Sequence, residues 1–274
     1  MTDTGLLYHY TDVGGMLGVV QNRTLWATDT NFLNDTQERT FANSALEEAA
    51  RLAKVPGFDE EVMADQLYGR AVLGFAQSRL RNLYVVCFSA HSDLLGLWRA
   101  YGKDQGYAIG FDKEALEKLP SPWQDETPPT LREVTYGASD ELRDEIRDYL
   151  SSLNETPTAH PGVMAQYSTW LEEKLATVKH PAFADERETR LVYGSIQLED
   201  LSPDDEGKSV VRFRRGKFSV VPYLEVKWPR EALKKIVIGP GAHWETRMAG
   251  LQRLLACHGL PDVRVEASTM PLRE

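Results

Sequence analysis

The stretch Asp185-Glu186-Arg187-Glu188-Thr189-Arg190-Leu191-Val192-Tyr193 carries two glutamates two residues apart, followed by an apolar run of β-forming residues. Because residues i and i+2 of a strand point to the same face, Glu186 and Glu188 should project together, with Arg190 beside them. Two carboxylates that close repel each other, which predicts a raised pKa for at least one of them. Such pairs occur where a cation develops or a proton moves, although a solvated strand edge with an arginine counterion gives the same pattern.

Outward from this strand, short strands and helices of uneven length are interspersed along the chain. Runs rich in β-branched and aromatic residues predict strands at 6–11, 24–28, 82–89, 107–111, 131–136, 210–213, 218–226, 233–238 and 263–267. Apolar residues at helical spacing predict helices at 13–21, 41–54, 60–81, 94–101, 113–119, 140–153, 163–179 and 243–257. Regular βαβ spacing is absent, which predicts the α+β class, with a mixed or mostly antiparallel split sheet flanked by helices. We expect a single domain over residues 1–274, with helical insertions at about 41–81 and 140–180.

Composition narrows the class of protein. The 274-residue chain has a formal net charge of −10, which argues against a broad phosphate-binding surface. The run Arg212–Lys217 (RFRRGK) is the one local basic candidate, and a solvated turn is its expected role. Neither Cys87 nor Cys257 has metal-binding spacing, so both are expected to be buried free thiols. The first residues lack a signal-peptide pattern and no apolar run reaches membrane-spanning length, which predicts a cytoplasmic protein without membrane contact.

Other segments supply side chains that a ligand could contact. His9 and Thr11 share one face of the first predicted strand, although a single strand histidine is commonly a core or edge residue. Ser89 ends the strand at 82–89, where a hydroxyl can bond a sugar or cap the next helix. Trp98 and Tyr101 are three residues apart, so they are neighbours on one helix face and could pack in the core or stack on a planar ligand.

Asn34, Asp35 and Glu38 crowd one predicted loop. They could cap the following helix, close over a pocket or attract a hard metal, but their spacing is not that of a calcium loop. The sequence also lacks a nucleophile elbow, a zinc signature and the glycine fingerprints of nucleotide-binding loops. We therefore expect no metal site, and metal-free chemistry on a carboxylate is the reaction class that remains.

Several segments in a fixed order resemble a widespread bacterial domain of unknown function that is found near phage-defence and abortive-infection genes. The matching segments are YHYT at 8–11, LWAT at 25–28, FLNDTQE at 32–38, CFSAHSDLLGLWRAYG at 87–102, GYAIGFD at 106–112, ERETRLVY at 186–193, KKIVIGPGA at 234–242 and S-x-x-PLR at 268–273. That family in turn resembles the ADP-ribosyltransferase fold.

The resemblance implies roles for individual residues. His9 matches the first-strand residue that contacts NAD, and Glu188 matches the catalytic second glutamate of E-x-E, with Glu186 as the first. Ser89 matches the first hydroxyl of a Ser-Thr-Ser strand, but Ala90 and His91 replace the rest of it. A first-strand histidine combined with E-x-E is a hybrid of the two main subclasses.

The resemblance also implies a reaction. Breaking the nicotinamide glycosidic bond of NAD develops an oxocarbenium ion, which a fixed carboxylate stabilises. NAD would be the substrate, and the acceptor could be a protein, a nucleic acid or water. The residues expected to bind NAD are His9, Thr11, Ser89, Trp98 and Tyr101. A non-catalytic nucleotide-sensing module of a defence system and a metal-free nuclease-like toxin are the alternatives.

Overall fold

The computed structural model describes residues 5–33, 36–52, 81–102, 105–121, 128–154, 170, 172–197, 209–216 and 219–271. The described strands are β1 (Leu6–Thr11), β2 (Thr24–Asp29), β3 (Arg81–Ser89), β4 (Tyr107–Asp112), β5 (Thr130–Glu133), β6 (Thr135–Tyr136), β7 (Val178–Lys179), β8 (Glu188–Gln197), β9 (Val211–Arg215), β10 (Val220–Lys227), β11 (Leu233–Ile238) and β12 (Arg264–Ala267). The described α-helices are α1 (Val13–Asn22), α2 (Thr36–Leu52), α4 (Leu95–Leu97), α5 (Lys113–Glu117), α6 (Asp140–Asn154) and α8 (Trp244–Cys257). Short helical turns are η1 (Thr30–Phe32), η2 (Trp98–Gly102), η3 (Pro181–Glu186) and η5 (Arg230–Ala232).

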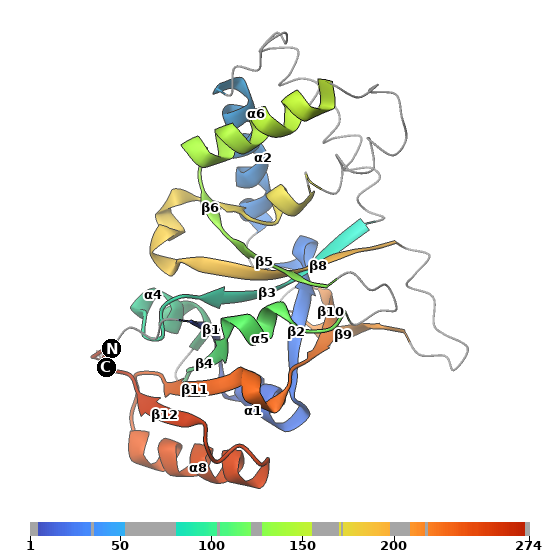
Figure 1. The fold of residues 1–274 in the computed structure, drawn as a ribbon. Helices are drawn as coiled ribbons and strands as arrows, with labels where there is room; N and C mark the ends of the chain where they lie inside the picture. The colour runs from blue at the N-terminus through green and yellow to red at the C-terminus, as the bar shows by residue number, and fades with distance from the viewer. Residues whose placement is uncertain are drawn as a thin grey trace.

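Most strands join one sheet in the order β12-β11-β4-β1-β3-β2-β10-β9 (Figure 1). Strand β8 pairs with β3 and β5 with β8, outside that path, and β6 and β7 form a separate pair. The pairings in the large sheet are antiparallel except for β11 with β12. The chain is therefore a mixed α+β protein with a largely antiparallel sheet flanked by helices, as the sequence predicted.

The sheet splits beside β3. One edge of β3 pairs with β8 along most of its length, from Arg81 to Ser89. The other edge is shared, because Ser89 pairs with β1 and Tyr84 and Val85 pair with β2. Strands β1 and β2 therefore diverge from β3, and the described pairings leave the edge between Val85 and Ser89 open. This divergence positions the cavity discussed below.

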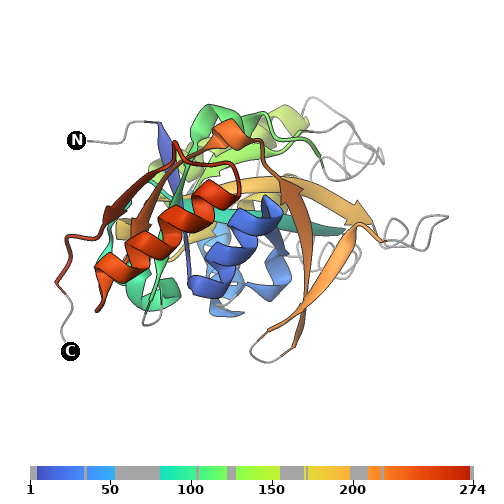
Figure 2. The same cartoon turned by 90° about the horizontal axis from the view of Figure 1, so that it is seen from below.

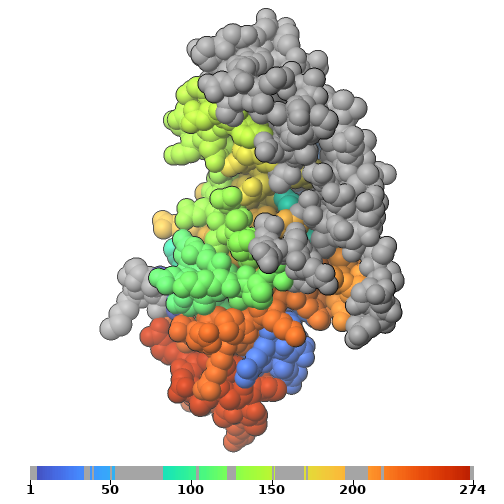
Figure 3. Space-filling model, turned by 45° about the vertical axis from the view of Figure 1, so that its right-hand side comes forward, coloured from blue at the N-terminus to red at the C-terminus, as the bar shows by residue number. Residues whose placement is uncertain are grey.

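Apolar clusters hold the helices against the strands. The largest contains Met16 and Val20 of α1 and Leu251 and Leu255 of α8, packed on one face of the sheet. Figure 2 shows α1 and α8 next to each other in front of the strands. A second core joins α2 to α6 and includes Val178 of β7. In the space-filling view α6 lies toward the upper end of the molecule and α8 at the lower end (Figure 3).

Some expectations fall outside the described residues or need correction. The predicted helix at 60–81 and the loop residues Asn34 and Asp35 lie outside the described residues, apart from Arg81, which begins β3. The predicted helix at 94–101 is instead α4 followed by a turn of π-helix. Cys257 is exposed and not buried, because it ends α8 on the solvent side. Among the described residues, no helix is long and apolar enough to cross a membrane.

Candidate functional site

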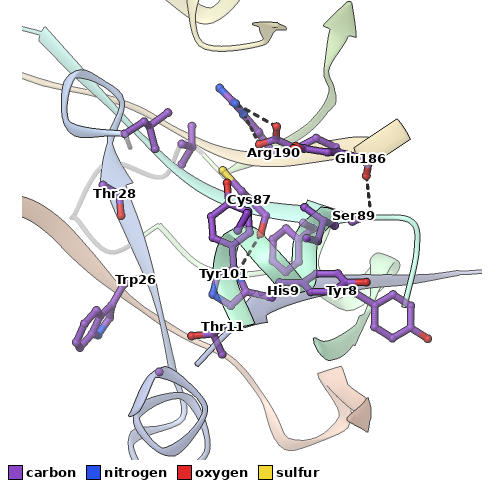
Figure 4. Close-up of a pocket in the computed structure, with 18 of the residues that line it drawn as sticks. Tyr8, His9, Thr11, Trp26, Thr28, Cys87, Ser89, Tyr101, Glu186 and Arg190 are labelled. Carbon is purple, nitrogen blue, oxygen red and sulfur yellow. Dashed lines mark hydrogen bonds and ion pairs between the residues drawn. The ribbon is translucent and has the colours of Figure 1, made fainter. Parts of the chain in front are cut away.

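A cavity of about 480 Å³ lies where β1 and β2 separate from β3 (Figure 4). Its volume is in the range of small-molecule sites in proteins. Its lining includes His9, Thr11, Ser89, Tyr101, Glu186 and Glu188. The structure thus brings together six of the seven side chains that the sequence singled out, and the seventh, Trp98, lies elsewhere.

His9 is held by the open edge of β3. Its Nδ1 lies 2.9 Å from the carbonyl oxygen of Cys87. A carbonyl oxygen only accepts, so Nδ1 must carry a proton, and Nε2 has a free lone pair whenever the ring is neutral. Burial lowers the pKa of His9, and the bond to Cys87 acts in the opposite direction. The imidazole is therefore neutral at pH 7, and it offers the cavity a hydrogen-bond acceptor.

His9 shares the cavity with Glu188 but not a sheet face. Tyr8 lies opposite Ser89, and Ser89 opposite Glu188, in one row across β1, β3 and β8. Directly opposite residues share a face, and successive residues alternate, so His9 belongs to the other face. Its ring enters the cavity where the sheet splits. The register of three strands, which sequence alone does not fix, decides this arrangement.

Glu188 is the centre of a buried charge cluster. Its Oε1 accepts a bond of 2.7 Å from Arg190 Nε, and its Oε2 accepts bonds of 2.9 Å from Lys179 and 3.2 Å from Arg190 Nη2. Burial alone would raise the pKa of Glu188, but the Arg190 and Lys179 charges lower it to about 2. Arg190 also donates to Glu38 of α2 and to the carbonyl oxygen of Ala176.

The raised pKa that the E-x-E spacing predicted is therefore wrong for Glu188. The prediction considered repulsion between two glutamates and omitted a cation between them. Lys179, on β7, lies 2.7 Å from Glu186 and 2.9 Å from Glu188 and bridges the two carboxylates. Burial alone would lower the pKa of Lys179, but Glu188 and Glu186 hold it above its usual value. Opposite charge outweighs like charge at these distances.

Glu186 does not lie on the same strand as Glu188. It ends η3, and Arg187 follows in the left-handed conformation with φ of 41°, before β8 begins at Glu188. Both carboxylates still point to Lys179 because the turn, and not strand alternation, orients Glu186. Ser89 fixes this turn, since its hydroxyl donates to the carbonyl oxygen of Glu186 at 2.6 Å. That bond uses the single proton of Ser89, so the side chain positions the Glu186–Glu188 segment.

Tyr101 and Trp98 lie in different environments. Tyr101 is 38% exposed on the π-helical turn and lines the cavity. Burial raises the pKa of its phenol. The negative charge of Glu188 acts in the same direction, and the positive charge of Lys179 acts in the opposite one. Trp98 is 3% exposed and packs on Tyr10 with ring centroids 4.7 Å apart. The indole Nε1 donates to Asp93, so Trp98 packs in the core and does not line the cavity.

Sequence reasoning missed several side chains that line the cavity. Lys179 gives no local signal, although two buried carboxylates require a nearby cation. Glu38 was considered as a cap, a lid or a metal ligand, and instead its carboxylate pairs with Arg190. Trp26 and Arg214, on β2 and β9, complete one wall. Arg214 comes from the basic run that was expected to be a solvated turn.

The comparisons with known proteins give one match. Residues 97–191 match the model of a family described as "Protein of unknown function (DUF2971)". The matching segment contains Tyr101, Lys179 and the Glu186–Arg190 stretch, but not His9. No curated protein and no solved structure matches the chain. Over less than half of its length, therefore, the chain is similar to a family whose function is unknown.

Proposed function

We propose that this protein is an NAD-dependent ADP-ribosyltransferase, or an NAD glycohydrolase where water is the acceptor. The observation that carries the proposal is the cavity shared by His9, Tyr101 and Glu188, which come from three separate segments of the chain. These residues supply a neutral acceptor, an aromatic ring and an ionised carboxylate. A nicotinamide riboside group presents hydroxyls, a flat cationic ring and a carbon that becomes positive during reaction.

The charge cluster suits a developing cation. Glu38, Glu186 and Glu188 carry three negative charges, and Lys179 and Arg190 carry two positive ones. The cluster therefore keeps a net charge of −1. Glu188 accepts three hydrogen bonds from Lys179 and Arg190, and the Cys87 thiol is also hydrogen-bonded to it, so a ribose hydroxyl would take the place of the thiol.

The proposed step breaks the bond between ribose C1′ and the nicotinamide nitrogen. The bonding electron pair goes to the nitrogen, which removes the positive charge of the pyridinium ring. Glu188 stabilises the resulting oxocarbenium ion, and Tyr101 packs on the nicotinamide ring. The acceptor oxygen or nitrogen then bonds to C1′ and loses a proton to Glu186, which is the more exposed of the two carboxylates, at 17% against 7%.

A second candidate is a non-catalytic nucleotide-binding module. It is favoured by the ion pairs of Glu188, because a carboxylate held by two cations is also what a purely structural cluster requires. It is favoured as well by His9, whose strand position lies on the other face from Glu188. In both candidates the cavity binds a nucleotide, and they differ in whether the glycosidic bond breaks.

The test is to incubate the protein with NAD and to measure nicotinamide release and acceptor labelling separately. We expect release by the wild type, and a loss of about a hundredfold or more in Glu188→Gln, the usual effect of removing one well-placed electrostatic group. Glu186→Gln should reduce acceptor labelling more than nicotinamide release. Glu133→Gln, an exposed carboxylate on β5, is the matched control.

The outcomes separate the candidates. Wild-type release by Glu188→Gln would remove the enzyme proposal, and NAD binding without cleavage would support the nucleotide-binding module. Cleavage of nucleic acid without use of NAD would indicate the nuclease alternative. The resemblance to defence-associated domains motivates a further expectation, that expression of the active protein depletes cellular NAD and stops growth, and that Glu188→Gln relieves both.

A further inference from the structure

Arg214, on β9, lines the cavity. Within the part of the chain that the structure describes, it takes no part in the ion pairs of the Glu188 cluster. Its Nη2 donates to Thr28 Oγ1 at 3.3 Å. Its guanidinium lies 6.0 Å from the centroid of the Trp26 ring, a distance at which a cation and an aromatic face attract. Its Nε is buried without a hydrogen-bond partner. Figure 4 shows Trp26 and Thr28 on one side of the cavity and Arg190 and Glu186 on the other.

Arg214 differs from the other cations of the cavity in its ion pairs. Among the described residues, no carboxylate lies within ion-pair distance of it, whereas Arg190 and Lys179 each contact two. A half-buried guanidinium with an unsatisfied donor costs free energy unless a partner arrives. An anion with several acceptor oxygens would satisfy both the charge and the donor.

The two sides of the cavity therefore carry opposite charge. One side has the anionic cluster of Glu38, Glu186 and Glu188, and the other has Arg214, Thr28 and Trp26. A ligand that fits both sides carries a cationic group at one end and a phosphate at the other. We propose that Arg214, oriented by Trp26 and assisted by Thr28, binds the diphosphate group of a nucleotide. This inference deepens the proposed function, and it rests on that proposal for the placement of the nicotinamide end beside Glu188.

The experiment measures ADP binding by calorimetry, with adenosine as the uncharged comparison. Arg214→Gln removes the charge, Arg214→Lys keeps it, and Arg215→Gln is the control, because Arg215 is exposed and does not line the cavity. We expect Arg214→Gln to weaken ADP binding by about tenfold or more, the usual size for a lost charge-assisted bond, with adenosine affected little. Arg214→Lys should retain part of the affinity, and Arg215→Gln nearly all of it.

The thermal midpoint of each variant separates a binding defect from unfolding. Equal ADP affinity in Arg214→Gln and Arg215→Gln would overturn the inference, and so would a wild type that binds no ADP. Binding of a short single-stranded oligonucleotide through Arg214 without any ADP binding would also overturn it. Failure of the enzyme proposal looks different, since ADP would bind through Arg214 while NAD released no nicotinamide.

Discussion

Replacing Glu188 by glutamine should destabilise the protein as well as inactivate it. Glutamine keeps the shape of the side chain and removes the charge that Lys179 and Arg190 neutralise. Lys179 would then pair with Glu186 alone, and Arg190 with Glu38 alone. If Glu186 and Glu188 were simply a repelling pair, the substitution would change stability little. The variant therefore distinguishes a repelling pair from a carboxylate that Lys179 and Arg190 neutralise.

The magnitude follows from the pKa of Glu188. It falls from 4.5 to about 2 on folding. Each pKa unit corresponds to about 1.4 kcal/mol, so the ionised carboxylate contributes roughly 3 kcal/mol at neutral pH. Because the folded pKa is the lower one, this contribution is complete above about pH 4.5 and is lost as the pH falls toward 2. At about pH 3 roughly 1 kcal/mol should remain.

The assay is urea denaturation of the wild type, Glu188→Gln and Glu133→Gln at pH 7 and at about pH 3. We expect the free energy of unfolding of Glu188→Gln to lie roughly 3 kcal/mol below that of the wild type at pH 7. The difference should narrow by about 2 kcal/mol at the lower pH, while Glu133→Gln follows the wild type at both. A Glu188→Gln variant as stable as the wild type at pH 7, or a difference independent of pH, would refute the reasoning.

Three further predictions concern His9, Tyr101 and Trp98. Nitrogen NMR should find His9 neutral at pH 7 with its proton on Nδ1, since burial lowers its pKa. A charged ring would contradict the lowered pKa, and a neutral ring with its proton on Nε2 would contradict the bond to Cys87. Tyr101→Ala should weaken NAD binding by about 1–3 kcal/mol, the usual worth of stacking on a base, and leave the thermal midpoint nearly unchanged. Trp98→Ala should instead lower the free energy of unfolding by about 3–5 kcal/mol, because its ring fills the core beside Tyr10. If Tyr101→Ala and Trp98→Ala changed NAD binding and stability to the same extent, the assignment of Tyr101 to the cavity and Trp98 to the core would be wrong.

The sequence predicted the α+β class and most strands because their apolar and β-branched runs are local signals. It also selected side chains that meet in one cavity, since Ser89 and Glu188 each stand at the end of a strand. What it missed depends on non-local geometry. The left-handed Arg187 removes Glu186 from the strand, and Lys179 reaches both glutamates from a strand of two residues.

Trp98 and Arg214 are two residues whose positions the sequence did not predict. Trp98 and Tyr101 are neighbours on a helix surface, and helical spacing does not say which of them faces the core. The π-helical turn exposes Tyr101 and buries Trp98. Arg214 belongs to a basic run that is expected to be solvated, and only the pairing of β9, β10 and β2 brings it to Thr28 and the cavity.

The most direct test is a crystal structure of the wild type with a carbocyclic NAD analogue, which binds like NAD but has no glycosidic bond to break. We predict that the analogue occupies the cavity where β1 and β2 separate from β3, with its nicotinamide end beside Tyr101 and Glu188 and its diphosphate on Arg214. An analogue bound elsewhere, or bound in the cavity with its diphosphate against Glu188, would contradict the account.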